Sequence, residues 1–359
     1  MEPFTTDEHE RLRARARAFA EERDGAESQP LALLRALGDA SLLSATDSLS
    51  LVVVREELAR ASGLCDALTG VQALAANAIA LAGSDALRRR WLPGLAAGTE
   101  VGAFALTEAA AGSDLGPLAT TARRDGAGYR IDGEKTLISN AGIASLYVVF
   151  ARTGGEGDRR PLSAFVVTAD AAGLSTRPLQ MSVAHPIGAV ALDGVRVDEG
   201  ARLGAEGDGK RIALATLSLM RPTVGAAACG MARRALDEAI AFARQRQTFG
   251  QPLAGRDSVR MALGDMATSL EAARLLVYRA AWEHDRTPES ARAASSMAKL
   301  FATEAAQQIV DRAVQIHGGQ GVLRGVTVER LYREVRALRI YEGTSEIQKL
   351  IIADALLGR

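Results

Sequence analysis

The feature that most constrains the fold is a change of hydrophobic period that occurs twice along the chain. Up to about residue 100, apolar side chains recur at helical spacing, as in the predicted helix over residues 7–24. From Val101 the apolar stretches become short and alternating, and after Gly209 helical spacing returns and continues to the end. The order of the chain is therefore helical, β, helical.

The middle segment is predicted to form an antiparallel sheet. Its strand-like stretches are rich in Val, Ile and aromatic residues, and turn residues separate them. No helical pattern intervenes, which disfavours repeated βαβ units. The predicted strands cover residues 101–106, 129–138, 147–151, 163–168 and 188–197.

The C-terminal segment is typical of a helix bundle, because its helical stretches are long and amphipathic. They cover residues 210–246, 258–285, 289–318, 328–339 and 344–357. We therefore predict an α+β protein with an N-terminal helical domain, a central antiparallel β-barrel or β-sandwich domain and a C-terminal four-helix bundle. The predicted domain bounds are residues 1–100, 101–205 and 206–359.

Composition excludes several classes of function. The 43 Lys and Arg residues balance the 43 Asp and Glu residues, whereas a general nucleic-acid binder needs a basic surface. The longest apolar stretches, such as 71–83, are too short and Ala-rich to span a bilayer, and the charged N-terminus lacks a secretory signal. The two cysteines and four histidines have no metal-ligand spacing. We therefore expect a cytoplasmic protein without a metal, a membrane span or a nucleic-acid partner.

Three segments contain the informative polar residues. Residues 104–114 run from a strand into a loop of small and hydroxyl side chains, and residues 133–141 form the end of another strand. In the third segment, 340–348, Glu342 precedes a Gly and a Thr–Ser pair that can start a helix. Taken alone, Glu342 is explained as an exposed carboxylate favoured by the helix dipole.

Taken together, six segments of the chain resemble the acyl-CoA dehydrogenase flavoprotein family, in that family's order and near its spacing. The resemblance extends over residues 84–357, and the helical–β–helical order agrees with it. The matching segments are Leu106–Glu108 through Gly112–Asp114, Gly133–Lys135 through Ser139–Ala141, Arg221–Pro222, Arg246–Gly250, Gln315–Gly321 and Ile340–Gln348.

This resemblance implies dehydrogenation of an acyl thioester between Cα and Cβ with non-covalently bound FAD. Glu342 matches the base that removes the α-proton, while the β-hydrogen leaves as a hydride to flavin N5. The α-proton is too weakly acidic for a solvated carboxylate, so burial that raises the pKa of the base is expected. In the family, the backbone N–H of the base and a flavin ribityl hydroxyl stabilise the enolate.

The resemblance also implies which residues contact FAD and substrate. On the same chain, the implied FAD contacts are Phe104, Leu106, Thr107, Gly112, Ser113, Leu137, Ser139, Thr344 and Glu346. On the neighbouring subunit, they are Arg246, Thr248, Phe249, Gln315, Gly318 and Gly319. The implied substrate contacts are Ser113, Ser218, Arg221 and Gly343. A flavin site made by two chains implies a homo-oligomer, and the family's usual assembly is a homotetramer formed as a dimer of dimers.

Several departures distinguish this chain from the family's usual pattern. Leu137 stands where many members have a Trp against the flavin, and Ser218 stands where many have an Asp facing the pantetheine arm. The N-terminal helical domain is also shortened. An acyl-CoA is the expected substrate, and the change at Ser218 leaves an acyl-carrier-protein thioester open.

The resemblance implies an electron-transfer flavoprotein as the electron acceptor. Two alternatives use the same fold: a flavin oxidase or monooxygenase, and the partner subunit of a heteromeric acyl-CoA dehydrogenase. Glu342 favours the dehydrogenase, because monooxygenase relatives do not need that base. The presence of all the flavin segments disfavours an inactive partner subunit.

Overall fold

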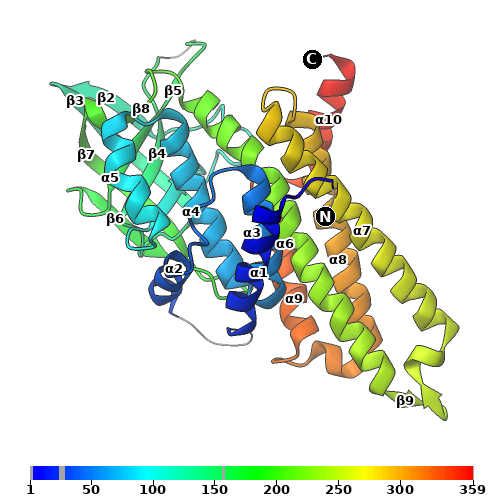
Figure 1. Ribbon diagram of the computed structural model, residues 1–359. Coiled ribbons are helices and arrows are strands. Elements are labelled where there is room, and N and C mark those ends of the chain that lie inside the picture. The colour runs from blue at the N-terminus through cyan, green and yellow to red at the C-terminus, as the bar shows by residue number, and fades with distance from the viewer. Residues whose placement is uncertain (1–2, 24–28, 156–157, 359) are drawn as a thin grey trace. The chain divides into compact units, whose positions relative to one another are not determined.

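The computed structural model describes residues 3–23, 29–155 and 158–358, which form two compact units (Figure 1). Of the described residues, 3–23, 47–66 and 218–358 form the helical unit, and 29–46, 67–155 and 158–217 form the β unit. The predicted α+β class, with helices at both ends of the chain and a sheet domain between them, is confirmed. The domain bounds near residues 100 and 205 stay predictions.

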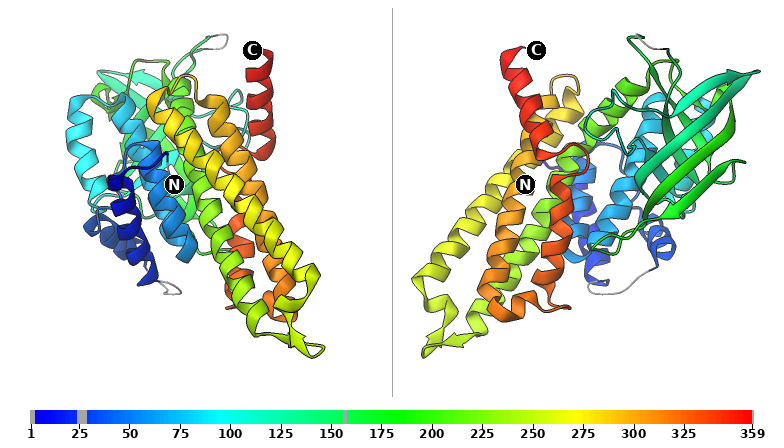
Figure 2. Two further views of the ribbon diagram at one scale, coloured as in Figure 1. Left: turned by 45° about the vertical axis from the view of Figure 1, so that its right-hand side comes forward. Right: turned by 180° about the vertical axis from the view of Figure 1, so that it is seen from behind.

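The helical unit is a bundle of long helices around a core of small apolar side chains. Its helices are α1 (Asp7–Glu21), α3 (Ser48–Ala61), the greater part of α6 (Gly209–Gln245), α7 (Asp257–Arg286), α8 (Arg292–His317), α9 (Thr327–Val335) and α10 (Ser345–Leu357). Figures 1 and 2 show α6, α7 and α8 running alongside one another. Val224, Val277 and Val310, one from each of these helices, share a buried cluster with many alanines.

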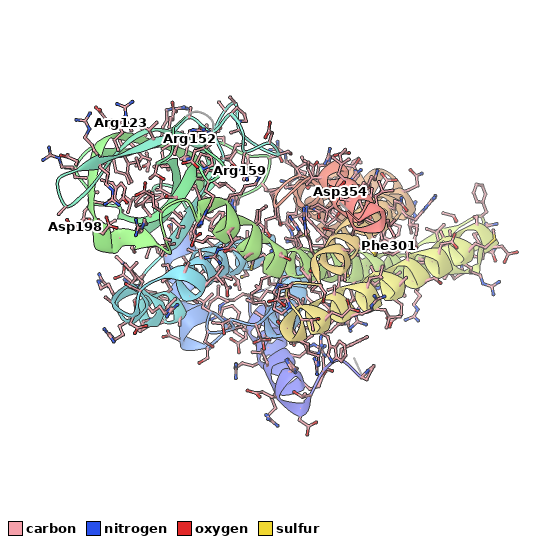
Figure 3. All side chains as sticks on the ribbon, turned by 90° about the horizontal axis from the view of Figure 1, so that it is seen from above. Arg123, Arg152, Arg159, Asp198, Phe301 and Asp354 are labelled. Carbon is pink, nitrogen blue, oxygen red and sulfur yellow. The ribbon has the colours of Figure 1, made fainter. Side chains whose placement is uncertain are left out.

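The ends of these helices follow the sequence signals closely. The predicted helix over residues 7–24 corresponds to α1, and Asp24 lies outside the described residues. Thr344 is the N-cap of α10, because its side chain accepts a hydrogen bond from the Ile347 N–H at 3.4 Å. Figure 3 shows Phe301 of α8 and Asp354 of α10 at the same end of the unit, where α10 packs on α8.

The β unit combines one large sheet with three helices. The helices are α2 (Pro30–Asp39), most of α4 (Gly63–Ala82) and α5 (Asp85–Ala96). The strands are β1 (Gly102–Ala105), β2 (Thr121–Asp125), β3 (Gly128–Ser139), β4 (Leu146–Arg152), β5 (Leu162–Thr168), β6 (Leu174–Pro178), β7 (Ile187–Asp198) and β8 (Arg202–Leu203). They pair in the order β6-β7-β3-β2-β4-β5-β8, and β1 pairs with β4. The pairing is antiparallel except where β1 and β2 each lie parallel to β4.

Burial explains which strands the sequence predicts. The strands β4 and β5 are buried along almost their whole length, and their side chains pack with Ile79 of α4 and Trp91 of α5. A strand buried on both faces has a continuous apolar sequence. By contrast, β2 and β6 are short and mostly exposed, so they lack the alternating apolar pattern that would predict them.

Two helices, α4 and α6, are long and apolar enough to cross a membrane by length and composition alone. In each, 72% of the most apolar window is buried within the protein. Burial of this extent is typical of core helices in a soluble protein.

Candidate active site

Glu342 lies in the tight turn that connects the 3₁₀ helix η4 (Arg336–Arg339) to α10. Its φ angle is 54°, in the left-handed region that non-glycine residues rarely adopt, and Gly343 follows with a φ of 91°. Such a backbone costs about 1–3 kcal/mol and persists only where surrounding contacts hold it. One such contact comes from Gln348, whose Nε2 donates to the Gly343 carbonyl at 2.8 Å.

Lys299 of α8 holds the same turn. Its Nζ donates to the Tyr341 carbonyl at 2.7 Å and also to the Gly343 carbonyl, which are the carbonyls on either side of Glu342. The residue is 1% exposed. Burial lowers the pKa of Lys299 to about 8, although the negative charge of Glu342 acts in the opposite direction.

Charged groups from three other helices also act on Glu342: Arg55 of α3, Asp66 of α4 and Arg221 of α6. Arg55 and Asp66 form a buried bidentate ion pair, with Nε–Oδ1 and NH2–Oδ2 distances of 2.7 and 3.0 Å. The remaining Arg55 nitrogen donates to Thr223 Oγ1 at 2.8 Å. The pair is fully hydrogen-bonded, so its charges stay fixed close to Glu342.

The electrostatics suit a base. Burial has the largest effect on the pKa of Glu342 and raises it, whereas Arg55, Lys299 and Arg221 oppose that rise. Its Oε2 atom is buried and has no hydrogen-bond partner in the described part of the chain. A carboxylate with a raised pKa and a free oxygen can accept a proton from a weak acid.

Arg221 and Ser218 face the same side of α6, because they are three residues apart. Arg221 is 4% exposed, and its Nε and the Ser218 Oγ are buried without a hydrogen-bond partner among the described residues. Burial and the charge of Arg292 lower the pKa of Arg221 to about 10. Unpaired buried donors are costly, so these two groups are suited to a ligand that supplies acceptors.

In the β unit, a buried ion pair fixes the loop that follows β1. Lys135 Nζ lies 2.7 Å from Glu108 Oε1, and these side chains are 0% and 7% exposed. Lys135 also donates to the Leu106 carbonyl at 3.3 Å, and Glu108 accepts from the N–H groups of Ala119 and Thr120. This network positions Leu106 and Thr107, two of the predicted flavin contacts.

A bulge in β3 places two further predicted contacts. The register with β7 shifts between Lys135 and Ile138, and within that interval Leu137 adopts a φ of 55°. A bulge redirects a side chain, and Leu137 is accordingly 60% exposed. Ser139 Oγ lies 2.7 Å from His185 Nε2, and burial lowers the pKa of His185 to about 4. His185 is therefore neutral at pH 7 and orients the Ser139 hydroxyl.

The residues predicted to reach a neighbouring subunit's flavin lie where α6 and α8 end. The strands β9 (Gln247–Thr248) and β10 (Gln251–Pro252) form a hairpin whose tip carries Phe249, which is 96% exposed. Phe242 of α6 stacks on His317 of α8 with ring centroids 4.3 Å apart. This contact places Arg246, the first residue after α6, at the same end of the bundle as Gln315, Gly318 and Gly319. Arg246, Gln315, Gly318 and Gly319 are all exposed.

Sequence reasoning missed Lys299, Arg55, Asp66 and His185. Lys299 was detectable in principle, because it is a single charge on an Ala-rich helix face that would otherwise be buried. Arg55 lies in a helix with three other charged residues, so no local pattern distinguishes it. Asp66 is the only charged residue of α4 and was detectable in the same way as Lys299. His185 was considered only as a metal ligand, and its contact with Ser139 spans 46 residues.

Three family descriptions match the chain: acyl-CoA dehydrogenase N-terminal domain at residues 6–99, middle domain at 103–195 and C-terminal domain at 207–357. A 3-(aryl)acrylate reductase of Clostridium sporogenes is 37% identical, over 99% of this chain and 100% of its own. A caffeyl-CoA reductase–Etf complex subunit of Acetobacterium woodii is 38% identical, over 88% and 84%. The structure of butyryl-CoA dehydrogenase from Megasphaera elsdenii superposes with a TM-score of 0.94 at 30% identity, over 99% and 100%.

The chain therefore belongs to the acyl-CoA dehydrogenase family. It is an oxidoreductase of the class that acts on CH–CH bonds, and FAD is its cofactor. The predicted contacts fit that group: a Cβ added to Gly112, Gly318 or Gly319 would meet no atom within 4 Å, which leaves room beside the backbone. Exposed Leu137 and Phe249 offer apolar surface for a ring, and the hydroxyls of Ser113 and Ser139 can bond polar edges.

Proposed function

We propose that this enzyme dehydrogenates an acyl-CoA thioester between Cα and Cβ, with Glu342 as the base that takes the α-proton. The observation that carries the proposal is the state of Glu342: a strained turn holds it, burial raises its pKa, and its Oε2 has no partner among the described residues. A carboxylate in this environment is suited to accept a proton as weakly acidic as the α-proton of a thioester.

The backbone of the same residue is suited to the developing negative charge. The Glu342 N–H makes no hydrogen bond within the described chain, so it is free to donate to the thioester carbonyl as the α-proton leaves. Arg221 and Ser218 would bind polar groups of the substrate close to Glu342. When bound, FAD supplies the acceptor for the hydride that leaves Cβ.

The residues that would hold FAD are those that the family motifs match. The β unit would contribute Phe104, Leu106, Thr107, Gly112, Ser113, Leu137 and Ser139, and α10 would contribute Thr344 and Glu346. A second copy of the chain would add Arg246, Thr248, Phe249, Gln315, Gly318 and Gly319, which makes a homo-oligomer necessary for activity. We propose a dimer of dimers, with an electron-transfer flavoprotein as acceptor, since one relative is named as a subunit of an Etf complex.

The visible spectrum and an anaerobic titration test this function. The purified protein should show flavin bands at one flavin per chain, and an acyl-CoA added without oxygen should bleach them. Absence of bleaching by any acyl-CoA or matched carrier-protein thioester would contradict the dehydrogenase. A higher kcat/KM for the carrier-protein thioester than for the matched acyl-CoA would identify a carrier-protein thioester as the substrate. Rapid oxygen consumption during turnover would instead identify an oxidase.

Replacing Arg246 with Ala should lower FAD occupancy while leaving the protein folded. A guanidinium can make two charge-assisted hydrogen bonds to a pyrophosphate, and Ala can make none. Flavin content is measured after extensive dialysis, together with the circular dichroism spectrum. The matched control is Arg244→Ala, an exposed arginine two residues earlier, which should keep its flavin. Equal flavin content in both variants would contradict the contact between subunits.

A further inference from the structure

Lys299 is the buried cation nearest to the backbone of the turn that carries Glu342. It is 1% exposed, and its ammonium donates to the carbonyls of Tyr341 and Gly343. No carboxylate lies within ion-pair distance of it in the described chain. An ammonium buried without a directly bonded anion is costly, and a neutral residue of similar length would fill the same space at lower cost. The structure therefore keeps a charge here that folding alone does not require.

We infer that Lys299 is a positioning residue of the active site, which clamps the Glu342 turn through the two flanking carbonyls and presents a positive charge to the Glu342 carboxylate. The inference rests on the proposed role of Glu342 as the base. The clamp explains how a non-glycine residue keeps a φ of 54°, since Lys299 bonds the carbonyls of the residues before and after it.

The charge of Lys299 acts together with charged groups on α3, α4 and α6 that also act on Glu342. Arg55 and Asp66 form a neutral pair on α3 and α4, Arg221 lies on α6, and the Tyr341 phenol precedes Glu342 itself. Lys299 in turn faces Arg221, and Glu304 lies one turn further along α8. Glu304 is already bonded to Arg339 and Ser345. Among the described residues named here as acting on Glu342, Lys299 and Arg221 are the cations that no directly bonded carboxylate balances, and Arg292 adds a further positive charge beside Arg221.

The sign of the expected pH effect follows from these charges. Lys299 opposes the burial that raises the pKa of Glu342, so loss of Lys299 raises that pKa further. A base works only when it is ionised, and kcat/KM therefore falls on the acid side of its pKa. Loss of the Lys299 charge should consequently move the acid limb of the kcat/KM profile to higher pH.

The test compares Lys299→Met, which removes charge and donors, with Lys299→Arg, which keeps both. We expect Lys299→Met to lower kcat by about 100-fold with KM changed by less than about 3-fold, because misplacement of a catalytic group by about 1 Å costs this much. Its acid limb should move up by about one pH unit. Lys299→Arg should keep the acid limb at the wild-type pH even if kcat is lower. Flavin content should match the wild type in both variants.

A titration without substrate gives a second readout. The infrared band of the Glu342 carboxyl group is obtained by subtracting the spectrum of the corresponding Glu342→Gln variant. Its pH dependence should show that Glu342 protonates at a higher pH in Lys299→Met than in the wild type. The control is Thr303→Val, which removes a buried hydroxyl that donates to the Lys299 carbonyl at 2.9 Å. Thr303→Val should lower thermal stability without moving the acid limb or the infrared titration.

The outcomes separate this inference from the proposed function. If Glu342→Gln stays active, the assignment of the base is wrong, independently of the results for the Lys299 variants. If Glu342→Gln is inactive but Lys299→Met keeps the wild-type acid limb and infrared titration, Lys299 is a structural residue and the inference is overturned. If Lys299→Met does not fold, Lys299→Gln is used. If the acid limb of the kcat/KM profile then lies at the same pH in Lys299→Gln as in Lys299→Arg, the inference is overturned.

Discussion

Replacement of Glu342 by Gln should lower kcat for acyl-thioester dehydrogenation by about 10²–10⁴-fold, the usual contribution of a general acid–base group. The amide is nearly the same size as the carboxyl group, so the turn and its bonds to Lys299 and Gln348, which involve only backbone carbonyls of the turn, should persist. The amide cannot accept the α-proton. The loss should therefore fall on the chemical step, with flavin content and substrate affinity retained.

The measurement is the rate of flavin bleaching after anaerobic mixing with an acyl-CoA. A suitable control is Glu289→Gln, which changes an exposed carboxylate in the connection between α7 and α8 of the same unit. That variant should bleach at the wild-type rate. Bleaching by Glu342→Gln within about 3-fold of the wild-type rate would remove Glu342 from the mechanism, because loss of a true base costs far more.

A second large effect is expected on stability in the β unit. Lys135→Met should lower the free energy of unfolding by about 3–5 kcal/mol, because removal of one partner of a buried ion pair leaves an uncompensated charge. Glu108 would keep its two backbone donors from Ala119 and Thr120 but lose the only cation bonded to it among the described residues. The loop that carries Leu106 and Thr107 should loosen, so flavin content should fall as well.

Chemical unfolding of the apoprotein measures this loss, and two further variants test its cause. The double variant Lys135→Met with Glu108→Gln should recover part of the stability, since the amide oxygen can accept a backbone N–H without a buried charge. Arg196→Met breaks an exposed ion pair with Asp125 in the same sheet and should cost at most about 1 kcal/mol. A loss in Lys135→Met no larger than in Arg196→Met would contradict the argument.

The parts of the fold that sequence predicts are those with strong local patterns. The long bundle helices repeat a helical hydrophobic period over many residues. The buried strands β4 and β5 are continuous, mostly apolar stretches bounded by turn residues. The helix and strands that the sequence did not predict are α2, β2, β6, β8, β9 and β10. They are short, and β2 and β6 are mostly exposed. Their side chains meet too little of the core to show a period, and pairing with neighbouring strands decides their conformation.

The features of the candidate site also fall into those that the sequence predicts and those that only the tertiary structure shows. By itself, the sequence determined the helical–β–helical order, the position of Glu342 before a Thr-capped helix, and the motifs that identify the family. Only the tertiary structure decided what surrounds these residues. Lys299 bonds the carbonyls of Tyr341 and Gly343, which are 42 and 44 residues away in the sequence. Arg55 bonds Thr223, which is 168 residues away. Hydrophobic period and capping residues are local, whereas the pKa of a buried carboxylate depends on charges that distant helices bring to it.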